Sequence, residues 1–182
     1  MLPRRRVLAL IAALAAAPLV RADTAVPAEV RAALPDARLQ GQGSMRFLGL
    51  LVYEARLWSA AQPVLGDDWL QPLALEIVYA RRLDGRKIAE RSLEEMRRVG
   101  PMVPEQAERW LAEMTRLFPD VRNGDRITGV QRPGEGVRFY LNADLRGELR
   151  DPEFGRFFFG IWLSPRTSEP RLRESLLGSG RG

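Results

Sequence analysis

The sequence predicts an α+β fold in which an antiparallel β-sheet is covered by helices on one side. The first reason is the order of the elements: strand-like segments come first, two helix-like segments follow, and then strands and helices again. This grouping differs from the regular alternation that builds a parallel sheet. The second reason is length, because residues 37–178 suffice for one domain with a sizeable core and contain no internal repeat that would indicate another.

A pair of strands is predicted over residues 37–60, with a turn at Leu48-Gly49. The second strand of the pair, LLVYEARLW, has Tyr53 at its middle, and its aromatic and β-branched residues favour extended backbone. A third strand is predicted over residues 73–81.

Two helices are predicted next, because apolar residues recur there at three-and-four spacing. The first covers residues 84–99, where Asp84 can cap the helix start. The second begins at Pro104 and ends before Pro119, since proline is favoured in the first turn of a helix and stops one that it follows.

A hairpin and two further helices complete the predicted domain. Strands are expected over residues 126–131 and 137–141, joined by the glycine-rich turn at 133–136. Residues 151–163 are predicted as a helix whose aromatic stripe, from Phe154 to Trp162, either packs in the core or lines a pocket. A short last helix is expected over residues 170–177.

The chain contains no histidine and no cysteine. Ser-His-Asp and Cys-His catalysis, thiolate redox chemistry and zinc sites built from these residues are therefore excluded. We expect neither a metal nor a cofactor. Carboxylate pairs such as Glu94-Glu95 are expected on solvated helix faces rather than in acid-base catalysis.

Residues 1–22 have the features of a cleaved signal peptide. Three arginines, at positions 4–6, precede an apolar run at 7–20 that is shorter than the ~20 residues of a membrane-spanning helix. Small residues at Val20 and Ala22 favour cleavage after Ala22, so we expect a periplasmic or secreted protein with no transmembrane segment after cleavage. Alternatives are export by the twin-arginine route and a retained membrane anchor.

The charge balance gives no indication of a nucleic-acid partner. The leader holds four of the 28 basic residues and none of the 23 acidic ones, so the rest of the chain is nearly neutral. Residues 23–36 are rich in alanine and proline and are expected to form a flexible lead-in to the domain at 37–178, with a short tail at 179–182.

Two stretches resemble the bacterial secreted branch of the chalcone isomerase-like family. They are GQGSMRFLGLLVYEARLW near the start of the domain and DPEFGRFFFGIWLSPRTSEPRLRESLLG at its end. The resemblance implies an open-faced sandwich with a pocket between a long antiparallel sheet and a helical layer. The family includes isomerases of plant flavonoid synthesis, non-catalytic binders of fatty acids and bacterial members whose role is unsettled.

The resemblance also implies two ligand-binding residues. Arg46 follows Gly41 and Gly43 and matches the arginine that anchors a carboxylate in the fatty-acid binders, although the spacing is one residue longer than usual. Tyr53 matches the tyrosine that assists it, where the isomerases have threonine. A guanidinium and a phenol hydroxyl both donate hydrogen bonds that suit a carboxylate beside an apolar slot. The alternative is that Arg46 lies at the solvated end of a hairpin.

The catalytic set of the isomerases is incomplete in this chain. At the positions where the isomerases carry tyrosine, lysine and asparagine, the sequence has Asp84, Lys87 and Arg91, so the lysine alone is retained. Lys87 is therefore a candidate catalytic residue only if the protein is an isomerase, and otherwise is expected to be solvated.

The leading hypothesis is an exported, non-catalytic binder of a fatty acid or similar amphipathic carboxylate. The first alternative is an isomerase, an intramolecular lyase acting on a chalcone-like phenolic enone, which would stabilise developing charge with Arg46 and Lys87. The second is a structural or partner-binding protein of the periplasm. The binder and the isomerase hypotheses both imply a small amphipathic or aromatic ligand. No feature of the sequence identifies a protein partner.

Overall fold

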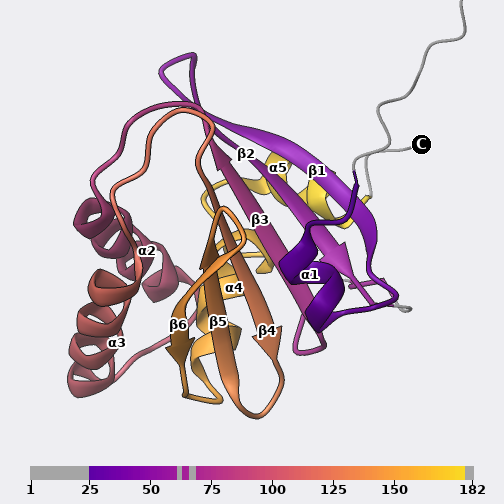
Figure 1. Cartoon of the computed structure of the whole chain (residues 1–182). Helices are drawn as coiled ribbons and strands as arrows, with labels where there is room; N and C mark the ends of the chain where they lie inside the picture. The colour runs from indigo at the N-terminus through magenta and orange to yellow at the C-terminus, as the bar shows by residue number, and fades with distance from the viewer. Residues whose placement is uncertain (1–24, 61–62, 66–68, 179–182) are drawn as a thin grey trace, which may run out of the picture.

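The computed structural model describes residues 25–60, 63–65 and 69–178, and it shows one sheet of six antiparallel strands flanked by helices (Figure 1). The expected α+β fold is confirmed. The strands lie side by side in chain order, as β1 (Arg38–Phe47), β2 (Leu50–Ser59), β3 (Leu73–Tyr79), β4 (Arg126–Arg132), β5 (Gly136–Leu141) and β6 (Asp144–Leu149). The helices are α1 (Ala28–Ala33), α2 (Gly85–Val99), α3 (Pro104–Leu117), α4 (Phe154–Leu163) and α5 (Pro170–Leu177).

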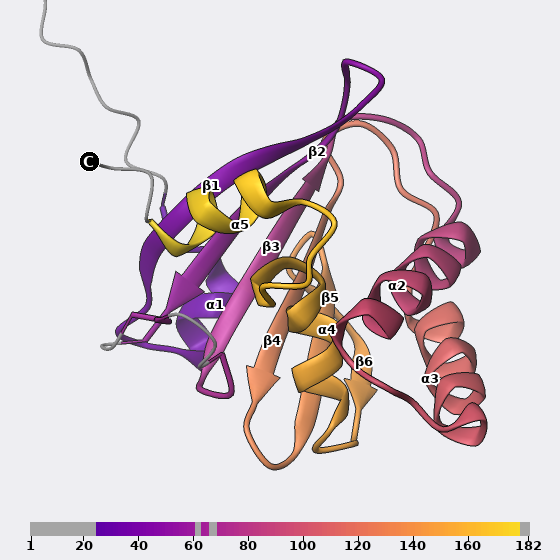
Figure 2. The ribbon, with the colours of Figure 1, turned by 180° about the vertical axis from the view of Figure 1, so that it is seen from behind.

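The two faces of the sheet carry different layers. Helices α4 and α5 pack across one face, with α2 and α3 beside them (Figure 2). We call this the helical face, and Leu57, Leu75 and Phe139 point from it into the main core. The short helix α1 lies on the opposite face (Figure 1), which we call the α1 face, where Trp58 and Val130 contact it. Side chains alternate between the faces because successive residues of a strand point in opposite directions.

The starts of the two long helices follow from local chemistry that the sequence predicts. The Asp84 side chain accepts a hydrogen bond from the backbone N–H of Lys87 at 3.0 Å and so caps α2. Pro104 is the first residue of α3, where its missing N–H costs nothing. Helix α2 is also fixed at its start by the Asp120 carboxylate, which accepts from the N–H of Gly85 at 3.0 Å.

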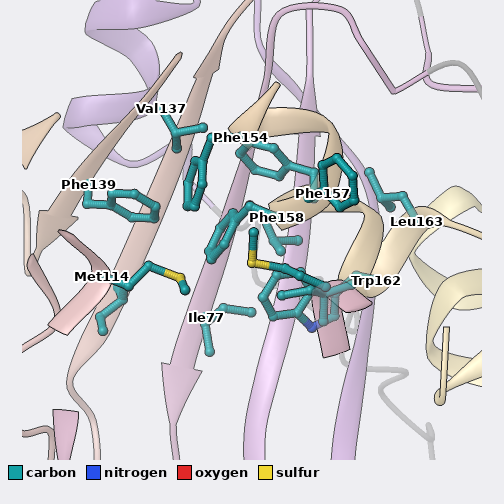
Figure 3. Packing of buried hydrophobic residues seen from close by; sticks show 14 of the residues in the cluster. Ile77, Met114, Val137, Phe139, Phe154, Phe157, Phe158, Trp162 and Leu163 are labelled. Atoms are coloured by element: carbon teal, nitrogen blue, oxygen red, sulfur yellow. The ribbon is translucent and has the colours of Figure 1, made fainter. Parts of the chain in front are cut away.

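Aromatic side chains of α4 form the centre of the main core (Figure 3). The Phe158 ring stacks on Phe154, with centroids 5.4 Å apart, and meets Phe139 of β5 edge to face at 5.1 Å. Trp110 of α3 packs against Phe154 and Phe157. Such aromatic contacts add to the free energy gained by removing the rings from water, and they hold α4 in one position above the sheet.

Three elements differ from the sequence-based expectation. Residues 23–36, expected as a flexible lead-in, contain α1, which is held by tertiary contacts because Val30 is fully buried against the sheet. Strand β6 was not predicted, since it is a short edge strand that leaves Leu145 exposed. Helix α4 begins at Phe154 rather than at residue 151, because the Asp151 carboxylate accepts bonds from Trp110 and from the N–H of Glu153.

The proposed signal peptide at 1–22 and the tail at 179–182 lie outside the described residues. Among the helices that are described, none combines the length and the apolar character needed to cross a bilayer.

Candidate functional site

A largely apolar cavity of about 180 Å³ lies between the helical face of the sheet and helices α2 and α4. Each neighbouring element contributes to its wall, and examples are Met45 of β1, Val52 of β2, Ile77 of β3, Ile88 of α2, and Phe158 and Trp162 of α4. The aromatic stripe predicted in α4 thus serves both purposes. Phe154 and Phe157 are buried in the core (Figure 3), whereas Phe158 and Trp162 also line the cavity.

Two tyrosines lie at the polar side of this cavity. The Tyr53 hydroxyl accepts a hydrogen bond of 2.9 Å from the indole N–H of Trp162, and its ring meets Tyr79 edge to face at 6.3 Å. Burial raises the pKa of Tyr53 to about 12 and also raises the pKa of Tyr79. Both phenols are therefore protonated at neutral pH. Because Tyr53 accepts from Trp162, its own O–H proton can still be donated to a ligand.

An arginine and a glutamate of α2 line the same cavity one helical turn apart. The guanidinium of Arg91 donates to Glu94 at 3.0 Å and lies within ion-pair distance of Glu95. Glu95 is 7% exposed at its side chain, and its second oxygen lies 3.2 Å from Nε of Arg98. Neither oxygen of Glu95 makes a contact with hydrogen-bond geometry, so its buried carboxylate retains unused acceptor capacity beside the cavity.

The charges around the cavity are mixed. Arg91 is 59% exposed at its side chain and therefore lies at the solvent side of the cavity. Glu169, from the segment before α5, also belongs to the lining, as does Ser168. One cation and two carboxylates thus surround a wall that is otherwise apolar. In the part of the chain described, no group of three or more carboxylates is arranged to hold a metal ion.

The structure brings Tyr53 into the cavity but places Arg46 outside it. Arg46 is exposed at the end of β1, where its guanidinium donates to the carbonyl of Gly49 at 3.2 Å. Its neighbour Met45, which pairs with Tyr53 across the strands, is the residue that lines the cavity. The pairing of β1 with β2 is irregular between Met45 and Arg46, and Arg46 is not among the residues that line the cavity.

Lys87 also lies apart from the cavity. Its side chain is exposed in the first turn of α2, and it is not among the residues that line the cavity. Arg91, one turn further along α2, is the member of the Asp84, Lys87 and Arg91 set that reaches the cavity. Tyr53 and Arg91 therefore line the same cavity, whereas Arg46 and Lys87 do not line it.

Sequence reasoning missed the roles of Glu95 and Glu169. Glu94-Glu95 was expected on a solvated helix face, and this is correct for Glu94 but wrong for Glu95, which is buried. A signal was present, because Glu95 continues the four-residue spacing of Lys87 and Arg91 along one side of α2. No sequence signal distinguished Glu169.

This architecture defines a class of protein: an open-faced sandwich with an apolar cavity between its sheet and its helical layer. The sequence matches the chalcone isomerase-like family over residues 20–178. The chain belongs to this family, as the two sequence stretches indicated.

Two known proteins extend the comparison. A crystal structure of an Arabidopsis thaliana fatty-acid binding protein superposes with a TM-score of 0.62 and 15% identity, covering 79% of this chain and 88% of that one. This likeness confirms the fold. A Haemophilus influenzae protein described as uncharacterized is 30% identical over 108 residues, which is 59% of this chain. The match spans about half of that relative, 52% of its length.

Proposed function

We propose that this protein is a non-catalytic binder of a fatty acid or a similar amphipathic carboxylate. The observation that carries the proposal is the pairing of an apolar cavity with two donors on its polar side, the Tyr53 hydroxyl and the Arg91 guanidinium. The apolar wall would receive the alkyl chain, and the donors would receive the head group. Each methylene removed from water contributes about 0.8 kcal/mol, so even a short chain supplies a substantial part of the affinity.

The head group would be held without any transfer of a proton. Arginine pairs two-to-two with a carboxylate in a planar arrangement, and a phenol supplies a further donor. Arg91 takes over the part that the family resemblance assigns to Arg46, from a helix instead of a strand. Tyr53 keeps the part that the resemblance assigns to it.

Two observations favour binding over isomerase chemistry. Lys87, the retained member of the isomerase set, is exposed and lies outside the cavity. The pKa of Tyr53 is raised by burial to about 12, so this phenol is a poor base near neutral pH. The groups that remain in the cavity hold charge and donate hydrogen bonds, which is what a binder requires.

The size and charge of the cavity limit the ligand. Its volume of about 180 Å³ lies below the ~300–1,000 Å³ of typical sites for drug-sized ligands, which favours medium-chain over long-chain acids. Arg91 already contacts Glu94 and Glu95, so a ligand carboxylate must compete with them. We therefore expect moderate affinity, in the micromolar range, about −8 kcal/mol.

Calorimetric titration with octanoate, laurate and palmitate tests the proposal. Octanoate or laurate should bind, and Arg91→Ala and Tyr53→Phe should each weaken binding about tenfold. Arg97→Ala is the matched control, because Arg97 is exposed on the same helix and does not line the cavity. Arg46→Ala distinguishes the two candidate carboxylate-binding residues. If this variant alone loses affinity, Arg46 rather than Arg91 binds the carboxylate. Absence of binding to all three acids, with no lipid copurifying in native mass spectrometry, would rule out the proposal.

We also propose that the protein acts outside the cytoplasm. The leader at residues 1–22 supports this, and a binder of amphipathic acids suits a compartment next to a membrane. N-terminal sequencing of protein recovered from the periplasmic fraction should begin at Asp23. Recovery of an uncut chain from the cytosol would contradict it.

A further inference from the structure

The hairpin that joins β1 and β2 extends beyond the rest of the sheet (Figures 1 and 2). Its tip, residues 46–50, exposes three large apolar side chains: Phe47 is 61% exposed, Leu48 86% and Leu50 57%. These are three of the seven exposed large hydrophobic residues in the described part of the chain. Their concentration within four consecutive positions differs from the isolated exposed leucines that are normal on protein surfaces.

The turn at this tip holds Leu48 in a left-handed backbone conformation that leucine disfavours. Leu48 has φ 50° and Gly49 has φ 80°, which is the pattern of a two-residue turn with both residues left-handed. The hairpin between β5 and β6 adopts the same pattern with Asn142 at φ 50° and Ala143 at φ 80°. Asparagine tolerates this conformation far better than leucine. Neither turn chemistry nor burial accounts for Leu48, and such a strained exposed residue indicates a function.

The charge and position of the tip indicate what it contacts. No acidic residue occurs between Arg38 and Tyr53, and Arg46 adds a positive charge at the tip itself. Met45 and Val52, immediately behind the tip on the two strands, line the ligand cavity. The tip is thus adjacent, along both strands, to residues of the cavity wall.

We propose that the hairpin tip docks on a lipid bilayer that contains anionic lipids, with Phe47, Leu48 and Leu50 inserted among the head groups. Three side chains are too small a surface for a stable protein interface, which buries about 800 Å² on each partner. Insertion into the interfacial region of a membrane needs no complementary partner surface, and apolar burial combines there with attraction between arginine and anionic lipid. Docking would place the cavity next to the membrane in which amphipathic acids dissolve. That last step rests on the proposed function, whereas docking itself does not.

Vesicle flotation with the purified protein tests docking. Ligand-free vesicles of phosphatidylethanolamine and phosphatidylglycerol should carry the protein, and pure phosphatidylcholine vesicles should carry less. Leu48→Asn places at the tip the residue used in the second hairpin, so the fold should be kept while the bound fraction falls at least tenfold. Leu145→Ser is the matched control, because Leu145 is 60% exposed on β6 and lies away from the tip.

The outcomes separate docking from ligand binding. Arg91→Ala should float with vesicles like the wild type, and Leu48→Asn should bind laurate in solution like the wild type. In a Leu48→Trp variant, fluorescence should shift to the blue on addition of vesicles. Equal flotation of Leu48→Asn and the wild type, or no flotation of the wild type, would overturn docking. If the protein self-associates in solution and Leu48→Asn abolishes this, the tip contacts a second copy of the chain rather than a membrane.

Discussion

The two faces of the sheet bury carboxylates in different ways. On the α1 face, Glu76 is 2% exposed and accepts hydrogen bonds from the indole of Trp58 at 2.9 Å and from Arg56 at 3.3 Å. Glu29 of α1 accepts from Thr128 at 2.8 Å and from Arg126 on the same face. The contacts of Glu76 join neighbouring strands, and those of Glu29 tie α1 to the sheet.

On the helical face, Glu95 is also buried, but neither of its oxygens makes a contact with hydrogen-bond geometry. Its charge is balanced by Arg91 and Arg98, and the residue also lines the cavity. The buried carboxylates of the α1 face accept hydrogen bonds and serve the fold, although Nε of Arg126 on that face has no hydrogen-bond partner. On the helical face, Glu95 is paired with two arginines without hydrogen-bond geometry and also borders the cavity. Departures from ideal satisfaction of buried polar groups are expected at functional sites.

The largest expected effect comes from breaking the network of the α1 face. Glu76→Ala should lower the free energy of unfolding by about 3 kcal/mol, because it leaves Arg56 and the indole of Trp58 without their buried partner. Laurate affinity should stay within twofold, since the cavity is on the other face. Urea unfolding and calorimetric titration measure the two quantities.

A matched variant on the same strand pair controls for loss of charge alone. Glu54 is 52% exposed and lies 3.9 Å from Arg56, so Glu54→Ala should change stability by less than about 0.5 kcal/mol. Equal destabilisation by the Glu76 and Glu54 substitutions would contradict the structural role assigned to the network.

The next effect concerns pH and belongs to the helical face. The pKa of Tyr53 is raised to about 12 in the folded protein by burial, while in the unfolded chain it is about 10. The neutral phenol is thus favoured by folding, and its stabilisation is complete below pH ~10 and is lost as the pH rises to about 12. The shift corresponds to about 2–3 kcal/mol. Tyr79, whose pKa burial also raises, changes stability in the same direction.

Absorbance of tyrosinate during an alkaline titration measures this directly. The wild type should show a component that titrates at about 12 and that is missing in Tyr53→Phe. Unfolding followed at several pH values above 10 should show a smaller loss of stability in the variant. If all the tyrosinate absorbance of the folded wild type appears near pH 10, the burial of Tyr53 is disproved.

The third effect concerns Glu95, the buried carboxylate that lines the cavity on the helical face. Glu95→Gln removes a negative charge beside the cavity and releases Arg91 from one of its two carboxylate partners. Laurate affinity should rise about tenfold, which is about 1.4 kcal/mol. Affinity for dodecanol, which carries no charge, should stay within twofold.

Glu94→Gln supplies the comparison, because Glu94 also contacts Arg91 but is 59% exposed. Water screens its charge, so its removal should raise laurate affinity by less than twofold. A fall in laurate affinity in Glu95→Gln would mean that Glu95 positions Arg91 for the ligand rather than competing with it.

Most elements of the fold could be predicted from the sequence because their signals are local. Asp84 and Pro104 mark the helix starts, and residues 151–163 have a periodic apolar pattern. Helix α1 (AEVRAA) consists mostly of good helix formers, but six residues are too few to form a stable helix alone, so it depends on the tertiary burial of Val30. Strand β6 is short and half exposed, so the alternation typical of a strand is weak there.

The site was predicted only in part, because it depends on how elements are rotated against each other. Tyr53, predicted to bind ligand, lines the cavity, and its part in binding stays a prediction. For Arg46, one position along the strand decides between the cavity and solvent. For Arg91 and Glu95, the rotation of α2 over the sheet decides which side of the helix faces the cavity, and that rotation is set by packing between distant segments.

The smallest expected effect has opposite signs for stability and for binding. Gly129, in the middle of β4, lines the cavity, and a methyl group there would meet the rings of Phe139 and Phe158 at 3.4 Å, an ordinary contact. Gly129→Ala should therefore raise the free energy of unfolding by about 0.5–1 kcal/mol. The same methyl group fills part of the cavity, so laurate affinity should fall severalfold.

Gly100→Ala is the control, because a methyl group at Gly100 would also meet a ring at 3.5 Å, that of Phe157, away from the cavity. That variant should leave laurate affinity unchanged. If Gly129→Ala lowers stability as well as binding, the glycine is required by packing alone. If it raises stability while weakening binding, the helical face keeps its cavity open at a cost to the fold, whereas the buried carboxylates of the α1 face are held by donors that serve the fold alone.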